Sequence, residues 1–135
     1  MASILKIDEL RGLTSAGDIT VTSEGGAATQ SLQQGLVKCF VYFDQYTSNT
    51  VQDSFNTSSV LDQATGIAYW NVTNGMSNVY GVLSGTTART GTPGISGGSG
   101  VIMNSTTQWH VYSTDAGTSN MEDAEWSASG HGDLA

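Results

Sequence analysis

The sequence predicts an all-β protein: a single antiparallel β-sandwich or jelly-roll-like domain, preceded by an extended N-terminal arm, with at most one short helix. Ser, Thr, Asn and Gly make up 58 of the 135 residues, and the apolar residues between them fall mostly in short β-branched and aromatic runs. Such runs suit a pleated, half-buried surface, whereas Gly, Asn and Ser favour the turns between strands. We therefore expect an anchoring arm with a short strand at residues 1–28 and a sandwich domain at residues 29–135.

The arm carries apolar residues whose spacing fits neither strict alternation nor a helical stripe. These residues, which we expect to anchor the chain to a partner, are Ile4, Leu5, Ile7, Leu10 and Leu13. Residues 18–22 alternate and predict a short strand. Thr29 is placed to cap a single helical turn that ends at Gly35, and this turn is the one helix that we expect.

Strands dominate the predicted structure from residue 36 onward. Seven runs are predicted as strands, at residues 36–43, 55–61, 67–73, 78–84, 100–103, 108–113 and 122–129. Turn clusters separate these runs at the spacing of a sandwich or barrel. The single cysteine, Cys39, lies within the first run, so we expect a small buried hydrophobe and no intrachain disulfide.

Asn74-Gly75 is the sharpest turn signal, because this dipeptide favours a two-residue type I′ hairpin. A hairpin at this point would pair residues 67–73 with residues 78–84 in one sheet. The alternative is that residues 76–78 extend the connection into a longer loop.

Residues 85–100 form the longest predicted irregular stretch, rich in Gly and Thr and containing the only proline, Pro93. No Gly-Lys-Ser/Thr sequence is present and no helix is predicted to follow, so the stretch lacks the features of a phosphate-binding loop. We expect a surface loop, either mobile or in contact with a neighbouring subunit or a host surface.

Charge and hydropathy exclude several classes of partner. Four Lys and Arg residues face twelve Asp and Glu residues, which gives a formal net charge of -8. An acidic surface repels nucleic acid and anionic lipid, so neither is an expected partner. We expect no secretory leader, because Lys6, Asp8 and Glu9 interrupt the apolar residues near the N-terminus, and no membrane span, because no apolar run is long enough.

No set of residues predicts an enzyme, a cofactor or a metal site. His110 lies in a predicted strand with Tyr112 on its own face and Trp109 and Val111 on the other, so we expect an exposed or hydrogen-bonded histidine and no catalytic triad. The acidic residues near the C-terminus are Asp115, Glu122, Asp123 and Glu125. We expect them to form a solvated acidic loop. A calcium site and a glycosidase pair are the alternatives, and both patterns are incomplete.

Aromatic side chains are the remaining candidates for binding. An amphipathic ring supplies much contact area at a low entropic cost, so sugar or protein contact is plausible, with core filling as the alternative for any one ring. The residues that we predict to form an exposed contact are Trp109, Tyr112, Trp126 and Pro93.

Several short segments resemble small structural proteins of marine tailed bacteriophages. The segments are residues 1–8 (MASILKID), 14–22 (TSAGDITVT), 32–38 (LQQGLVK), 53–60 (DSFNTSSV) and 131–135 (HGDLA). The resemblance covers most of the chain except residues 85–100. This family is described as virion-structural or tail-fibre-like.

The resemblance implies a non-enzymatic protein on the exterior of a virion, made in the host cytoplasm. The expected partners are a phage capsid or tail protein and sister copies of the chain, with a trimer as the favoured homo-oligomer. In the alternative function, a host surface glycan is a further partner. The chain has neither heptads nor an evident repeat with which to build a fibre shaft. We therefore expect a capsid decoration or knob-like protein, and a small tail-fibre or appendage protein is the alternative.

Overall fold

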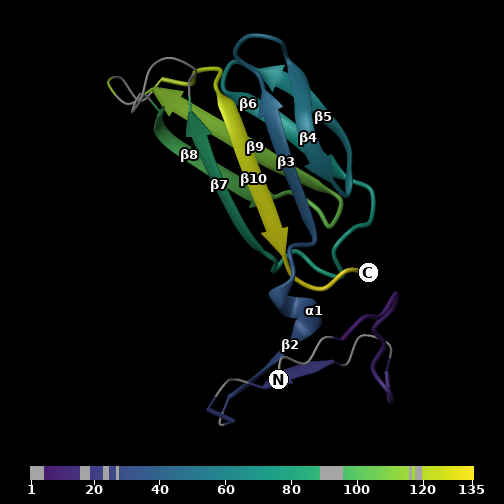
Figure 1. Ribbon diagram of the computed structural model, residues 1–135. Helices are drawn as coiled ribbons and strands as arrows, with labels where there is room; N and C mark the ends of the chain where they lie inside the picture. Colours follow the sequence, from purple (N-terminus) through teal and green to yellow (C-terminus); the bar gives the residue numbers. More distant parts are fainter. Residues whose placement is uncertain are drawn as a thin grey trace. The chain divides into compact units, whose positions relative to one another are not determined.

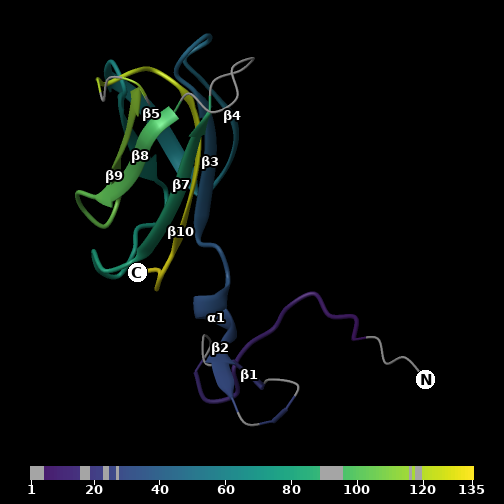
Figure 2. The same ribbon diagram turned by 90° about the vertical axis from the view of Figure 1, so that its left-hand side faces the viewer.

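The computed structural model describes residues 5–15, 19–22, 25–26, 28–88, 96–115, 117 and 120–135. The chain forms two compact units, Met1–Leu36 and Val37–Ala135 (Figures 1 and 2). The division lies later than the predicted boundary after residue 28. The reason is that strand β2 (Thr29–Ser31) pairs with strand β1 (Thr20–Thr22) and not with the sandwich.

The first unit contains a short antiparallel hairpin and one helical turn. Val21 of β1 lies opposite Gln30 of β2, and the backbone N–H of Leu32 donates to the carbonyl of Ile19 at 2.8 Å. The helix α1 spans Leu32–Gly35. The predicted helical turn is therefore confirmed, although Thr29 belongs to the preceding strand and does not cap the turn.

The second unit is a sandwich of two four-stranded antiparallel sheets, which confirms the predicted all-β fold. Its strands are β3 (Cys39–Asp44), β4 (Thr50–Phe55), β5 (Thr57–Ala64), β6 (Ile67–Val72), β7 (Val82–Ala88), β8 (Ser96–Met103), β9 (Gln108–Asp115) and β10 (Glu125–His131). One sheet has the order β4-β3-β10-β7, and the other has the order β5-β6-β9-β8. The first and last strands of the sandwich, β3 and β10, are therefore neighbours in the middle of one sheet.

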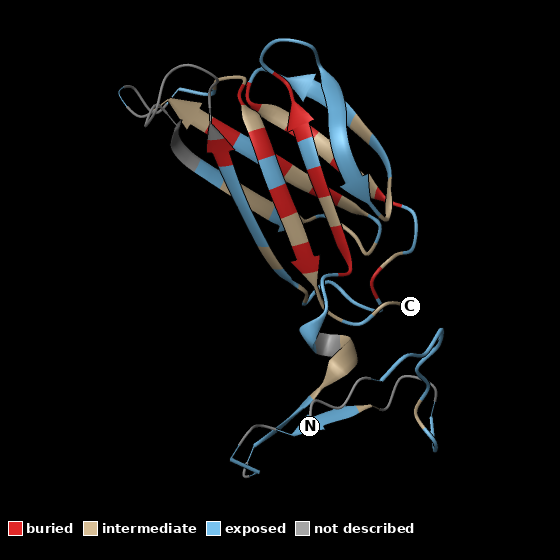
Figure 3. Cartoon of the chain, in the orientation of Figure 1, coloured by how far each residue is buried: buried red, intermediate tan, exposed pale blue. Residues whose placement is uncertain are grey.

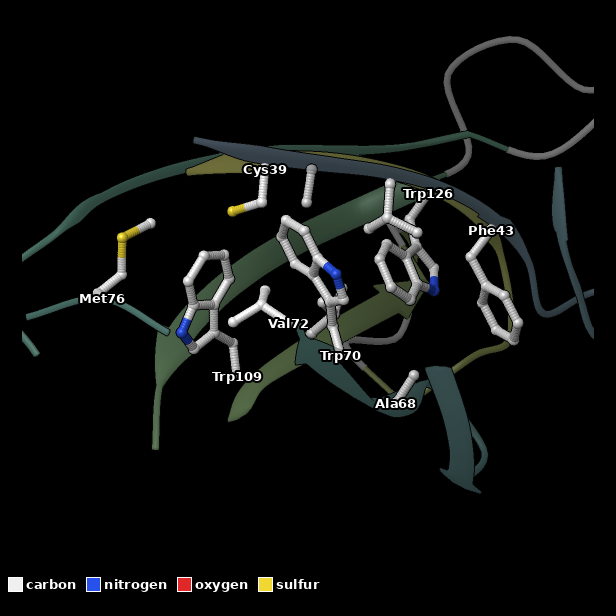
Figure 4. Packing of buried hydrophobic residues seen from close by; sticks show 11 residues of the cluster. Cys39, Phe43, Ala68, Trp70, Val72, Met76, Trp109 and Trp126 are labelled. Carbon is white, nitrogen blue, oxygen red and sulfur yellow. The ribbon is translucent and has the colours of Figure 1, made fainter. Parts of the chain in front are cut away.

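The core lies between the two sheets and is built by alternation along the central strands (Figures 3 and 4). The rings of Trp70 and Trp109 meet edge to face with centroids 4.5 Å apart, and Phe43 packs against Trp126 at 5.2 Å. Cys39 is fully buried, as predicted, and burial raises the pKa of its thiol to about 12. This core fills the sandwich without any contribution from a disulfide, because the chain has a single cysteine.

The predicted hairpin at Asn74-Gly75 is wrong. Strand β6 pairs with β5 and β9, whereas β7 pairs with β10 in the other sheet. Residues 73–81 form the longer connection that was the alternative. Met76 is buried within this connection and its N–H donates to the carbonyl of Thr106 at 2.8 Å. Because β6 and β7 belong to different sheets, the connection crosses from one sheet to the other.

The expected loop at residues 85–100 is also wrong over most of its length. Strand β7 continues to Ala88 and β8 begins at Ser96, and within this stretch only residues 89–95, with Pro93, lie outside the described residues. Close packing explains two of the glycines. A Cβ at Gly85 would lie 2.7 Å from Val101, and a Cβ at Gly100 would lie 2.1 Å from the ring of Tyr112.

Strand β4 was missed because it lacks the alternation on which the prediction depends. All six of its residues are exposed, as is common for an edge strand. The strand predicted at residues 55–61 is divided at Asn56, which has a positive φ of 54° and turns the chain from β4 in one sheet to β5 in the other.

Candidate functional site

The predicted anchoring residues that the structure describes are exposed. Leu13 is fully exposed, and Leu5, Ile7 and Leu10 are each at least half exposed. Ile4 lies outside the described residues. Four apolar side chains of the first unit are thus at least half exposed, and none of them belongs to the hydrophobic core.

Two of the four predicted contact residues are buried, and this part of the prediction is wrong. Trp109 and Trp126 have exposed fractions of 0% and 2% and point into the core (Figure 4). They lie on the inner faces of β9 and β10, where alternation directs them toward the opposite sheet. Tyr112 is exposed, and Pro93 lies outside the described residues.

The outer face of sheet β5-β6-β9-β8 is covered by rings that pack on the sheet itself. The ring of Tyr112 lies over Gly100, its partner on β8. Tyr69 and His110 face each other across β6 and β9, with their rings stacked at 4.4 Å. Nε2 of His110 also lies 2.9 Å from Nδ2 of Asn104. His110 is therefore the hydrogen-bonded strand histidine that was predicted.

The outer face of sheet β4-β3-β10-β7 contains a groove of about 410 Å³. Its outward-facing residues come from three adjacent strands, β3, β10 and β7, which lie side by side in Figure 1. Those residues are Phe40, Tyr42, Ser84, Thr86, Ser127 and Ser129. Val41, Gly85 and Ala128 alternate with them and complete the lining. The groove thus has two aromatic rings on one side and short hydroxyl side chains over the other two strands.

Hydrogen bonds fix several groups at this groove. The Tyr42 hydroxyl donates to Oε2 of Glu125 at 2.7 Å, and this bond raises the pKa of Tyr42. The hydroxyls of Ser84 and Ser129 lie 2.9 Å apart. No Lys, Arg or His is among the residues that line the groove. The lining therefore offers aromatic surface and hydroxyls, and the carboxylate of Glu125 lies at the Tyr42 hydroxyl.

The predicted acidic group is divided among structural hydrogen bonds. Oδ1 of Asp123 accepts from the N–H of Gly66 at 2.6 Å, and the carbonyl of Glu122 accepts from Ser113. Glu125 points toward Tyr42 at the edge of the groove. Over the described ranges, no group of three or more His, Cys, Asp or Glu residues is placed to hold a metal ion.

Asp44 organises the turn between β3 and β4. Its carboxylate accepts hydrogen bonds from the N–H and hydroxyl of Thr47 and from the hydroxyl of Ser48. Burial disfavours the charged form, but these hydrogen bonds outweigh it and lower the pKa of Asp44 below its ordinary value. Asp44 is thus a structural carboxylate of the turn.

Sequence reasoning missed the groove. The hydroxyl residues of its lining belong to predicted strands or to the predicted loop, where they look like ordinary solvent-facing residues. They are Ser84, Thr86, Ser127 and Ser129. Only the pairing of β10 with both β3 and β7 brings them beside Phe40 and Tyr42. The one signal in the sequence was strand alternation at residues 39–43, which places the rings of residues 40 and 42 on one face, opposite Cys39.

No family model matches the sequence, and neither the curated proteins nor the solved structures gave a match. Within the part of the chain that the structure describes, no helix has the length and apolar character needed to cross a membrane.

Proposed function

We propose that this chain is a non-enzymatic structural protein on the exterior of a tailed-phage virion, a small capsid decoration or knob-like protein held by its N-terminal arm. The observation that carries this proposal is the contrast between the two units. The sandwich encloses a core of its own, whereas Leu5, Ile7, Leu10 and Leu13 of the first unit are exposed. Exposed apolar side chains that recur along one segment are available for burial against another protein.

Assembly is the mechanism that this proposal implies. The arm lies against a capsid protein, a tail protein or a sister copy, either by adding a strand or by filling a groove. Many copies on a symmetric shell then turn weak individual contacts into firm attachment. A cyclic arrangement such as a trimer also covers exposed strand edges.

Quantitative mass spectrometry of purified particles tests the arm. We expect particles made with Leu5, Ile7, Leu10 and Leu13 all changed to Ser to lose most of this protein. The matched control is Val82→Ser, which alters an exposed apolar residue of the sandwich and should leave the copy number unchanged. Full retention of the four-serine protein, or of a protein lacking residues 1–24, would overturn the proposal.

The second candidate function is a small tail-fibre or appendage protein that binds host surface glycans. The groove on sheet β4-β3-β10-β7 favours it, because the groove combines aromatic rings with hydroxyl groups. Cryo-electron microscopy of intact particles separates the two candidates by position. Density at capsomers supports a decoration protein, and density at the tail supports an appendage.

A further inference from the structure

We propose that the groove over β3, β10 and β7 is a binding site for a short, uncharged saccharide. This inference deepens the second candidate function by naming the residues and the class of ligand. Its test uses the isolated protein, so it does not depend on where the protein lies in a particle.

The shape of the groove suits a small ligand. Its volume of about 410 Å³ lies within the range of roughly 300–1,000 Å³ that is usual for small-molecule sites. Phe40 and Tyr42 project from β3, whereas the neighbouring outward positions on β10 and β7 carry only Ser and Thr.

The lining offers both kinds of contact that a sugar ring needs. A pyranose has apolar C–H faces and a rim of hydroxyls, and aromatic rings beside hydroxyl groups complement the two surfaces. The ring of Tyr42 is held in place by its hydrogen bond to Glu125, and the ring of Phe40 stacks with Phe55 at 6.2 Å. Rings that are already fixed lose little conformational freedom when a ligand binds.

Charge selects an uncharged ligand over an acidic one. Glu125 borders the groove and Asp53 is the partner of Tyr42 on β4, whereas no cation is among the lining residues. An anionic sugar would meet like charge without a compensating group. The same charges disfavour a second copy as the occupant, because two identical faces would bring these carboxylates together.

Nuclear magnetic resonance titration of the full-length protein tests this assignment. The probes are maltotriose, cellotriose and mannotriose, with sialyllactose as the anionic comparison. We expect at least one neutral trisaccharide to shift the amide signals of residues 40–42, 84–86 and 127–129, and sialyllactose to bind more weakly than the best neutral sugar.

Three variants make the test specific. Tyr42→Ala removes one ring and should weaken binding by about tenfold. Ser127→Leu should also weaken binding, because the larger side chain fills the groove. The matched control is Tyr112→Ala, which removes a tyrosine of similar exposure, 37% against 40% for Tyr42, from the opposite sheet and should leave the affinity unchanged.

The proposal is overturned if none of the three neutral trisaccharides binds at about 10 mM. It is also overturned if the shifts map to another surface, if Tyr42→Ala binds as well as the natural protein in a sample with an unchanged fold, or if sialyllactose binds most tightly. A protein that binds sugar but is absent from the particle would leave this inference standing and would contradict the proposed virion function instead.

Discussion

Apolar side chains lie in opposite environments in the two units of the chain. In the sandwich, Trp70, Trp109 and Trp126 have exposed fractions of 2% or less and pack together with the rest of the core. In the first unit, Leu10 is half exposed and Leu13 is fully exposed. Apolar residues therefore stabilise the sandwich itself, whereas those of the arm contribute little until another surface covers them.

This contrast matters because it separates stability from attachment. A residue that is buried in the core affects every function of the protein through folding. An exposed residue of the arm affects the free energy of unfolding by little, so its loss reports on partner binding alone. All three tryptophans belong to the sandwich, so tryptophan fluorescence follows the unfolding of that unit.

The largest effect is expected from Trp70→Ala. Removing this buried ring should lower the free energy of unfolding by about 3–5 kcal/mol, because it leaves a cavity in the core. Leu13→Ala in the first unit should change it by less than about 0.5 kcal/mol. Denaturant titration followed by tryptophan fluorescence measures both values.

Two milder variants, Trp70→Phe and Trp109→Phe, test the packing of the core if Trp70→Ala does not fold. Nε1 of Trp70 donates to Oγ1 of Thr57 at 2.9 Å, whereas Nε1 of Trp109 is buried without a hydrogen-bond partner among the described residues. Trp70→Phe should therefore cost about 1 kcal/mol more than Trp109→Phe. Equal costs for the two phenylalanine variants would contradict this account of the core.

Two glycines with nearly the same positive φ give the second comparison. Gly66 has a φ of 69° in the sandwich, and Gly26 has a φ of 70° in the first unit. A Cβ at Gly66 would lie 2.6 Å from backbone atoms of Glu122 and Ser113, whereas a Cβ at Gly26 would meet nothing within 4 Å. Gly66→Ala should therefore destabilise the sandwich by more than about 2 kcal/mol.

Gly26→Ala is the control for this prediction. It should leave the fluorescence-monitored unfolding midpoint unchanged, because its strain is confined to the other unit. A shift of equal size for both alanine variants would show that the two units do not unfold independently, and the contrast between them would then fail.

The smallest effect is expected from the carboxylate of Asp44. Its pKa is lowered in the folded state, so its charge stabilises the fold above the ordinary pKa of about 4 and that contribution is lost as the pH falls through the folded value. Asp44→Asn should thus lower stability at pH 7, and the difference from the natural protein should shrink below about pH 4. Asp8→Asn, at an exposed position of the first unit, is the matched control and should leave the unfolding of the sandwich unchanged. Unfolding curves recorded between pH 3 and pH 7, about the carboxylate range, provide the measurement.

The strands with clear alternation could be predicted from the sequence. Residues 67–73 and 108–113 were expected as strands, and β6 and β9 lie there. The burial of Cys39 followed from the same pattern. Strand β4 could not be found in this way because every residue in it is exposed, and the glycine-rich start of β8 carries few side chains that could form a pattern.

The environment of the aromatic residues and the groove could not be predicted. Alternation places Trp109 and His110 on opposite faces of one strand, but it does not say which face meets the other sheet. Likewise, nothing in the local sequence joins Ser84 to Ser129, because their pairing depends on strands 45 residues apart. The predicted roles of the arm residues stay predictions, since exposure alone does not identify what covers them.

The central place of β10 has a consequence for synthesis on the ribosome. This strand is the last of the sandwich to be translated, yet it lies between β3 and β7 and carries Trp126 into the core. Until it emerges, two strand edges stay unpaired, and such edges invite association with other nascent chains. The sandwich is therefore expected to close only after residues 125–131 have left the ribosome, at a rate limited by a contact that spans almost the whole unit.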